Sequence, residues 1–148
     1  KMKKLLSYKL LALSFFLISW GYSNAQCNTN SLKGNCTGQL ASGFTYIKSY
    51  PLEKAKINAK GEIEYSFVFS KGTIYMLTFA NSEGKASDIE ITLYDPSHNK
   101  IASNFDSGSG DYFPLGYKCS STGVHYMTFK FKSGTTPCGL SILGFKRG

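Results

Sequence analysis

The two histidines are the first residues to consider for catalysis, because a neutral imidazole is the usual general base near neutral pH. His98 lies in the segment 95–99, whose composition predicts a turn, and His125 lies in an apolar run beside Met127. A nucleophilic hydrolase needs a nucleophile beside its base, and no serine of the chain lies in a Gly-x-Ser-x-Gly motif. We expect structural roles for both histidines, with a small secreted hydrolase as the alternative.

Two pairs of carboxylates, Glu62 with Glu64 and Asp88 with Glu90, are each separated by one residue in runs that predict strands. Side chains with this spacing share one strand face and lie about 7 Å apart, which is close to the separation of the two acids of an inverting glycosidase. The same pattern is typical of a solvated strand face, and no motif around either pair favours catalysis. We expect surface residues, and no catalytic site in the chain.

The loop 106–111, Asp-Ser-Gly-Ser-Gly-Asp, is a candidate calcium site, because calcium binds oxygen ligands on flexible loops. Asp106, Asp111, a serine and backbone carbonyls would be its ligands. The loop lacks the acid at every second position of an EF-hand, so a surface turn is the alternative. We expect no other cofactor.

Tyrosine is frequent, with ten residues in the chain. Outward-facing tyrosines could stack on sugars or dock a protein partner, because the ring offers apolar area and a polar hydroxyl. Alternatively, they fill the edges of the core with their hydroxyls in solvent. The candidates for ligand-facing aromatic residues are Tyr46, Tyr50, Tyr94, Tyr112 and Tyr117.

The four cysteines are Cys27, Cys36, Cys119 and Cys138. An even number in an exported chain predicts two disulfides, for which three connectivities are possible. A Cys27–Cys36 pair would leave the other two near opposite ends of a strand about 30 Å long, whereas a disulfide needs Cα atoms within about 7 Å. The N-terminal cysteines could instead each join the leading segment to the C-terminal half, so the connectivity stays open. The chain contains no Cys-x-x-Cys pair, so the sequence does not favour a zinc site.

The first 25 residues predict a secretory signal peptide. Lys1, Lys3 and Lys4 supply a positive start, the stretch from Leu10 to Trp20 is almost wholly apolar, and Ser23-Asn24-Ala25 forms a small-x-small cleavage site. A permanent membrane anchor would need about 20 apolar residues, and this stretch is shorter. We expect cleavage near Ala25, a secreted, periplasmic or envelope location, and no stable membrane span after processing.

Cleavage would change the charge balance of the protein. Removing residues 1–25 takes away four of the seventeen basic residues and leaves thirteen against nine acidic ones. The remaining lysines are scattered, and Arg147 is the only arginine. Nucleic-acid readers cluster their basic residues and use arginine for bidentate contacts, so we expect no nucleic-acid partner.

The rest of the chain predicts an all-β fold. Apolar and polar residues alternate in 62–69, 73–79 and 88–94, where β-branched and aromatic side chains dominate. We expect a loop at 26–39, no helix in the mature chain, and further strands at 44–47 (ended by Pro51), 52–58, 101–105, 112–119, 124–132 and 139–145. Eight or nine short strands with regular turns predict a jelly-roll-like, two-sheet antiparallel β-sandwich over residues 40–148, preceded by the signal-peptide helix.

The order of motifs points to a known family. A strand ending Tyr-x-Phe-x-Phe precedes Lys-Gly and Tyr-x-Leu-x-Phe, and Asp-Ile-x-Ile-Thr-Leu-Tyr-Asp and Thr-Gly-Val-x-Tyr follow. Over residues 57–145 this order resembles the bacterial pre-peptidase C-terminal (PPC-like) domain, a jelly-roll-like module attached to secreted proteases and other exported proteins. The residues that carry the resemblance are Tyr65, Phe67, Gly72, Tyr75, Leu77, Asp88, Leu93, Tyr94, Asp95, Ile101, Thr122, Gly123 and Tyr126.

The resemblance implies a non-catalytic secreted module, sometimes involved in substrate binding, although this sequence carries no protease segment. The Cys119 and Cys138-Gly139-Leu140 elements also resemble small secreted proteins of Bacteroidetes-type bacteria. We therefore expect a binding or structural module at the cell envelope or outside it. A protein partner is the first expectation and carbohydrate the second, and an inert subunit of an envelope complex is a further alternative.

Overall fold

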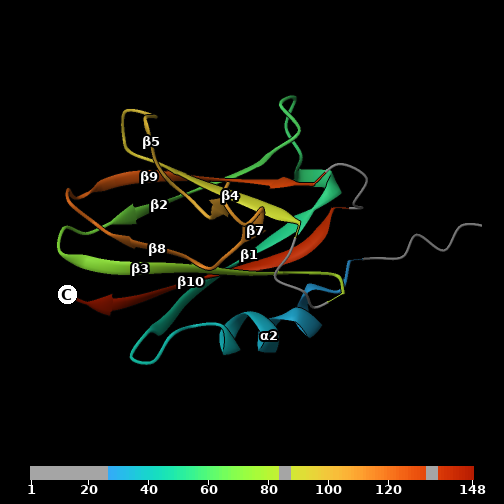
Figure 1. The fold of residues 1–148 in the computed structure, drawn as a ribbon, viewed down its shortest axis with the longest axis horizontal. Coiled ribbons are helices and arrows are strands. Elements are labelled where there is room, and N and C mark those ends of the chain that lie inside the picture. The colour runs from blue at the N-terminus through green and yellow to red at the C-terminus, as the bar shows by residue number, and fades with distance from the viewer. Residues whose placement is uncertain (1–26, 84–87, 133–136) are drawn as a thin grey trace, which may run out of the picture.

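The structure is a computed structural model that describes residues 27–83, 88–132 and 137–148. The expected signal peptide and the residues 84–87 and 133–136 lie outside these ranges. Within them, two four-stranded antiparallel sheets pack face to face, which confirms the predicted β-sandwich (Figure 1).

We call the sheet with strand order β1-β10-β3-β8 sheet A and the sheet with order β2-β9-β4-β5 sheet B, and β6 and β7 form a separate hairpin. The strands are β1 (Thr45–Glu53), β2 (Ile63–Phe69), β3 (Thr73–Asn81), β4 (Ile89–Tyr94), β5 (Lys100–Ser103), β6 (Phe105–Asp106), β7 (Asp111–Tyr112), β8 (Leu115–Lys118), β9 (Gly123–Phe131) and β10 (Cys138–Arg147).

The strand pairs are nested along the chain: β1 pairs with β10, β2 with β9, β3 with β8 and β4 with β5. Such nesting arises when the chain doubles back as one long hairpin. Successive pairs then alternate between sheets A and B, which is the arrangement of a jelly roll.

Alternate side chains fill the space between the sheets. Ile63 of β2 lies opposite Phe129 of β9, which lies opposite Ile91 of β4. These three residues are fully buried, as are Phe79 of β3 and Leu143 of β10 from the facing sheet. The apolar residues that alternate in 62–69, 73–79 and 88–94 therefore supply much of the core between the sheets.

The segment after Cys27 is helical, so the prediction of a loop without helix was wrong. The 3₁₀-helix η2 (Thr29–Leu32) runs into the α-helix α2 (Lys33–Gly38), and both lie along the outer face of sheet A (Figure 1). Their buried side chains pack on outward-facing residues of β3 and β10. This outer cluster consists of Leu32, Cys36, Ala80, Leu140 and Ile142, with Leu40 at its edge.

Two hydrogen bonds fix this segment on β3. Thr78 Oγ1 donates to the Cys36 carbonyl at 2.8 Å, and Gln39 Nε2 donates to the Phe79 carbonyl at 2.9 Å. Strand β3 is thus covered on both faces. The segment is helical because its apolar side chains pack on the apolar outer face of sheet A. This tertiary contact cannot be read from the local sequence of the segment.

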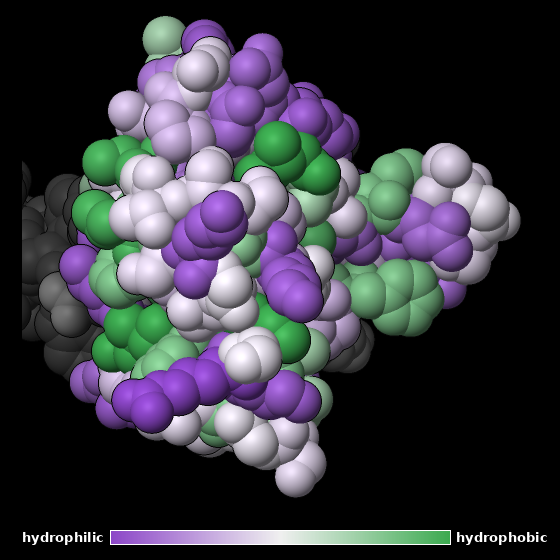
Figure 2. All heavy atoms as spheres, turned by 90° about the vertical axis from the view of Figure 1, so that its left-hand side faces the viewer, coloured by the Kyte–Doolittle hydropathy of each residue, from purple (hydrophilic) through white to green (hydrophobic). Residues whose placement is uncertain are grey.

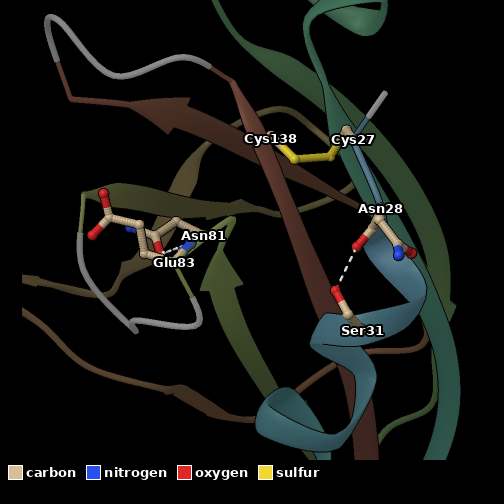
Figure 3. Close-up of a disulfide and its surroundings, with 6 residues drawn as sticks. All are labelled: Cys27, Asn28, Ser31, Asn81, Glu83 and Cys138. Carbon is tan, nitrogen blue, oxygen red and sulfur yellow. Dashed lines mark hydrogen bonds between the residues drawn. A yellow bond between two sulfur atoms is a disulfide. The ribbon is translucent and has the colours of Figure 1, made fainter. Parts of the chain in front are cut away.

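One disulfide, between Cys27 and Cys138, ties the start of the helical segment to the start of β10 (Figure 3). Cys36 and Cys119 are buried and unpaired, so the prediction of two disulfides was wrong. Cys119 packs in the core between the sheets, whereas Cys36 lies in the outer cluster, so sheet A separates the two thiols. Burial raises the pKa of the Cys36 thiol to about 12, which keeps it protonated and unreactive.

The sequence predicted that Pro51 would end the first strand. In the structure β1 continues through Pro51 to Glu53. Among the strands that the structure describes, β1 is the edge of sheet A and pairs with β10 alone, and an edge strand tolerates proline. The expected strand at 52–58 is instead the end of β1 followed by the 3₁₀ turn η3 (Lys54–Lys56).

Two expected strands are each split in two. The run 101–105 divides at Asn104 into β5 and β6, and the run 112–119 divides at Pro114 into β7 and β8. The intervening β6–β7 hairpin therefore pairs with itself and not with either large sheet.

Candidate functional site

His125 lies in the core and does not reach the surface. Its side chain is fully buried, its ring stacks on Phe69 with centroids 4.8 Å apart, and its Nδ1 lies 3.0 Å from the Gly123 carbonyl oxygen. Its Nε2 has no hydrogen-bond partner among the described residues. A buried imidazole packed on a phenyl ring is a core residue, as the sequence predicted.

The other histidine lines a hollow of about 150 Å³ on the outer face of sheet B. The hollow brings together one of the carboxylate pairs and one of the tyrosines singled out in the sequence. We call it the sheet B hollow; its lining residues are Lys60, Glu62, Glu64, Tyr94, His98 and Thr128.

Strand register explains why these residues meet. Glu64 of β2 lies opposite Thr128 of β9, and Tyr94 of β4 lies opposite Tyr126 of β9. These positions alternate with the core residues and therefore face outward. The His98 ring folds back from the β4–β5 turn onto Tyr126, with ring centroids 4.0 Å apart and an interplanar angle of 27°.

The β4–β5 turn that carries His98 is held by Asp95. Its Oδ1 accepts hydrogen bonds from the backbone N–H groups of Ser97 and Asn99, both at 2.8 Å, and its Oδ2 accepts one from Asn99 Nδ2. These bonds, the Asn99 side chain first, lower the pKa of the Asp95 carboxyl. His98 has φ of 61°, a left-handed conformation that the bonded turn imposes.

A second turn holds the opposite wall of the hollow. Asn58 Oδ1 accepts hydrogen bonds from the backbone N–H groups of Lys60 and Glu62 at 2.9 and 3.1 Å. The Asn58 N–H donates to the Glu62 carbonyl, and Gly61 adopts φ of 77° to close the turn. Both walls of the sheet B hollow are therefore built on fixed turns.

The β6–β7 hairpin carries exposed aromatic side chains. Phe105 is 42% exposed and Phe113, just after β7, is 51% exposed. Phe105 lies against Tyr112, which is opposite it in the hairpin, with centroids 5.1 Å apart. The hairpin stands in front of the sandwich in Figure 1, and the projection at the right of Figure 2 shows apolar atoms beside hydrophilic ones.

Asn104 anchors the base of the hairpin. Its side chain is buried, accepts a hydrogen bond from the Ile91 N–H at 2.6 Å and donates one to the Ile89 carbonyl at 3.0 Å. Its own carbonyl accepts the Phe113 N–H at 3.0 Å. Asn104 thus ties the first end of the hairpin to β4 through its side chain and joins the two ends through its backbone carbonyl.

The tip of the hairpin is the expected calcium loop. Asp106 Oδ1 accepts the Gly108 N–H at 2.9 Å, and Asp106 Oδ2 accepts Ser109 Oγ–H at 3.2 Å. Within the described part of the chain, no three His, Cys, Asp or Glu side chains gather as metal ligands. The loop is thus closed by its own donors, and calcium binding by Asp106 and Asp111 stays a prediction.

The five candidate tyrosines have different surroundings. Tyr46 is exposed and Tyr94 lines the sheet B hollow. Tyr112 packs on Phe105, and Tyr117 packs against the core beside Phe69. Tyr50 is fully buried, so its assignment as a ligand-facing residue was wrong.

Sequence reasoning missed the residues that shape both surfaces. Asn104, Phe105 and Phe113 were assigned to continuous strands, and Lys60 and Thr128 were not singled out. The one local signal was Pro114, which predicts an interruption of pairing and here marks the end of the hairpin.

Comparisons with known proteins identify no family: no family model matches, and no curated protein matches significantly. One similar solved structure is the crystal structure of PliG from Aeromonas hydrophila, a periplasmic lysozyme inhibitor of g-type lysozyme. It is 12% identical, with a TM-score of 0.43, over 74% of this chain and 92% of that chain. At these values the likeness says nothing about what this chain binds, and the PPC-like resemblance stays a prediction.

The molecule belongs, by its fold, to the disulfide-bonded β-sandwiches. A disulfide is typical of proteins that fold outside the cytoplasm. In the described ranges, the helices are all too short or too polar to cross a membrane.

Proposed function

We propose that the protein is a secreted, non-catalytic binding module that docks on a protein partner through the β6–β7 hairpin. The observation that carries this proposal is the exposure of Phe105 and Phe113 on one short, anchored hairpin. Exposed aromatic rings are frequent anchors of protein interfaces, because each buries a large apolar area in a partner's pocket.

The hairpin is suited to binding because it is already ordered. The Asn104 side chain fixes its base, and Asp106 closes its tip through its own hydrogen bonds. A surface that needs no ordering on binding loses little conformational entropy, which increases affinity.

The charged and aromatic side chains of the hairpin indicate what kind of partner surface would be complementary to it. Asp106 and Asp111, paired across the hairpin, are its charged residues, and both are exposed. A complementary protein would offer apolar pockets for the phenylalanine rings and basic groups beside them. Export by a signal peptide cleaved near Ala25 would bring the module to such a partner at the envelope or outside the cell.

Site-specific photo-cross-linking in the producing cells tests the proposal. A photoreactive phenylalanine analogue at position 113 is expected to cross-link one defined protein, because this position lies in the proposed interface. The matched control is the same analogue at position 68, since Val68 is 56% exposed on β2, away from the hairpin. Equal cross-linking from both positions, or none from position 113, would refute the assignment of the hairpin.

A further inference from the structure

We propose that the sheet B hollow is a saccharide-binding site that takes one sugar unit. It lies on β2, β4, β9 and two turns, and shares no residue with the β6–β7 hairpin. The test of the sheet B hollow is therefore independent of the test of the β6–β7 hairpin.

The side chains of the sheet B hollow are polar and uncommitted. Among the residues that the structure describes, the side-chain polar groups of Lys60, Glu62 and Glu64 form no hydrogen bond or ion pair, although all three line the same hollow. The hydroxyl groups of Tyr94 and Thr128 have no such partner either. These donors and acceptors converge on one space and remain available to a ligand.

The mixture of groups selects the chemical class. The two carboxylates only accept hydrogen bonds and the Lys60 ammonium only donates, while hydroxyl groups do both. An apolar ligand would leave these groups desolvated without partners, and an anionic ligand would meet two carboxylates against one ammonium. A polyhydroxylated ligand satisfies acceptors and donors together.

The aromatic wall supplies the second feature of a sugar site. Tyr94 and His98 line one side of the hollow, and Tyr126 supports the His98 ring from behind. A pyranose ring presents a face of C–H groups that packs on an aromatic surface while its hydroxyls point outward to polar groups. Carboxylates opposite an aromatic wall match this two-sided chemistry.

Size and preorganisation limit the ligand to one unit. The volume of about 150 Å³ would hold about five water molecules at ~30 Å³ each, which is comparable with a single sugar ring. The Asp95 and Asn58 turns hold the two walls in place before any ligand arrives. Because the hollow is small and open, we expect a Kd of about 1 mM for a monosaccharide unit.

Titration of ¹⁵N-labelled mature protein with methyl glycosides tests this proposal. The panel holds a neutral hexose, an N-acetylhexosamine, an amino sugar and a uronic acid. We expect saturable shifts of backbone amides in 60–64, 94–99 and 126–128 with at least one of the first three, and weaker binding of the uronic acid.

Variants separate the site from the rest of the surface. Tyr94→Ala and Glu64→Gln are each expected to weaken binding by about tenfold or more, because they remove a wall or a charged acceptor. Tyr46→Ala is the control, since Tyr46 is an exposed tyrosine on sheet A. The proposal is overturned if no glycoside shifts those amides, if the uronic acid binds best, or if Tyr46→Ala weakens binding as much as Tyr94→Ala does.

Discussion

The ring of His98 stacks on the ring of Tyr126 at a centroid distance of 4.0 Å, although the two residues lie in different elements. Tyr126 faces outward from β9, and His98 reaches it because the β4–β5 turn folds over the outer face of sheet B. Gly123, at the start of β9, permits this approach, since a Cβ there would lie 2.7 Å from Cγ of Pro96 in the turn. One stacked pair thus joins a loop to the sheet and completes the wall of the hollow.

The Asp95 carboxylate is expected to stabilise this turn in a pH-dependent way. Hydrogen bonds from Asn99 and Ser97 lower its pKa below the ordinary 3.8, so its stabilising effect is present above that value and lost as the pH falls through the lowered pKa. Asp95→Asn should lower the Tm at pH 7, and the difference from wild type should shrink as the pH approaches 2. Thermal unfolding across this range checks it, and a difference that does not change with pH would contradict it.

Asn104 is expected to be essential for the order of the β6–β7 hairpin. Asn104→Ala leaves the buried Ile91 N–H and Ile89 carbonyl without their side-chain partner, which should cost about 2 kcal/mol of unfolding free energy. Urea unfolding measures this loss. In the variant, amide hydrogens at 105–113 should exchange faster than in wild type, and those of β9 should be accelerated less. The matched control is Asn99→Ala, an exposed asparagine, whose exchange at 105–113 should stay at the wild-type rate.

The Cys27–Cys138 disulfide closes a loop with a sequence separation of 111 residues. Replacing both cysteines by serine should reduce the unfolding free energy by about 2–5 kcal/mol, because a long cross-link restricts the unfolded chain. The helical segment 29–38 should also exchange its amide hydrogens faster, since the disulfide holds its start against β10. A loss below about 1 kcal/mol, with unchanged exchange in that segment, would show that packing of the outer cluster alone fixes the helices.

Tyr50 and Tyr65 should respond oppositely to removal of their hydroxyl groups. The Tyr50 hydroxyl is buried without a hydrogen-bond partner among the described residues, whereas the Tyr65 hydroxyl donates to the Pro51 carbonyl at 2.6 Å. Tyr50→Phe should leave stability unchanged or slightly higher, and Tyr65→Phe should cost about 1 kcal/mol. Denaturant unfolding of the two variants side by side decides it, and a larger loss for Tyr50→Phe would contradict the assignment.

Tyr50 also gives an alkaline counterpart to the Asp95 prediction. Burial first, and then the nearby Tyr65, raises the pKa of Tyr50 to about 12 from the ordinary 10.0. The stability that depends on its neutral form is complete below pH 10 and should decline as the pH rises through 12. Tyr50→Phe should therefore unfold less readily than wild type in this range.

The alternation in the sequence predicted the core because burial between two sheets imposes a period of two on β2, β3, β4 and β9. It did not predict the helices at 29–38, because their apolar side chains need the outer face of sheet A, which exists only after β3 and β10 pair. The sheet B hollow was not predicted for the same reason, because Glu64 and Thr128 become neighbours only through the register of β2 and β9. The β6–β7 hairpin was not predicted because the run 101–105 reads as one strand. In the structure the strand stops at Asn104, whose side chain forms hydrogen bonds with β4.

The central claim is that exposed aromatic residues of the β6–β7 hairpin bind a protein partner, and one affinity measurement tests it most directly. Calorimetric titration of the cross-linked partner, once purified, would compare wild type with Phe105→Ser/Phe113→Ser and with Val68→Ser/Val124→Ser, a control pair exposed on sheet B. At ~2 kcal/mol for each of the two anchors, the hairpin variant should raise the Kd by about a thousandfold, and the control should change it less than about twofold. Equal effects of the two variants, or an unchanged Kd for the hairpin variant, would contradict the account.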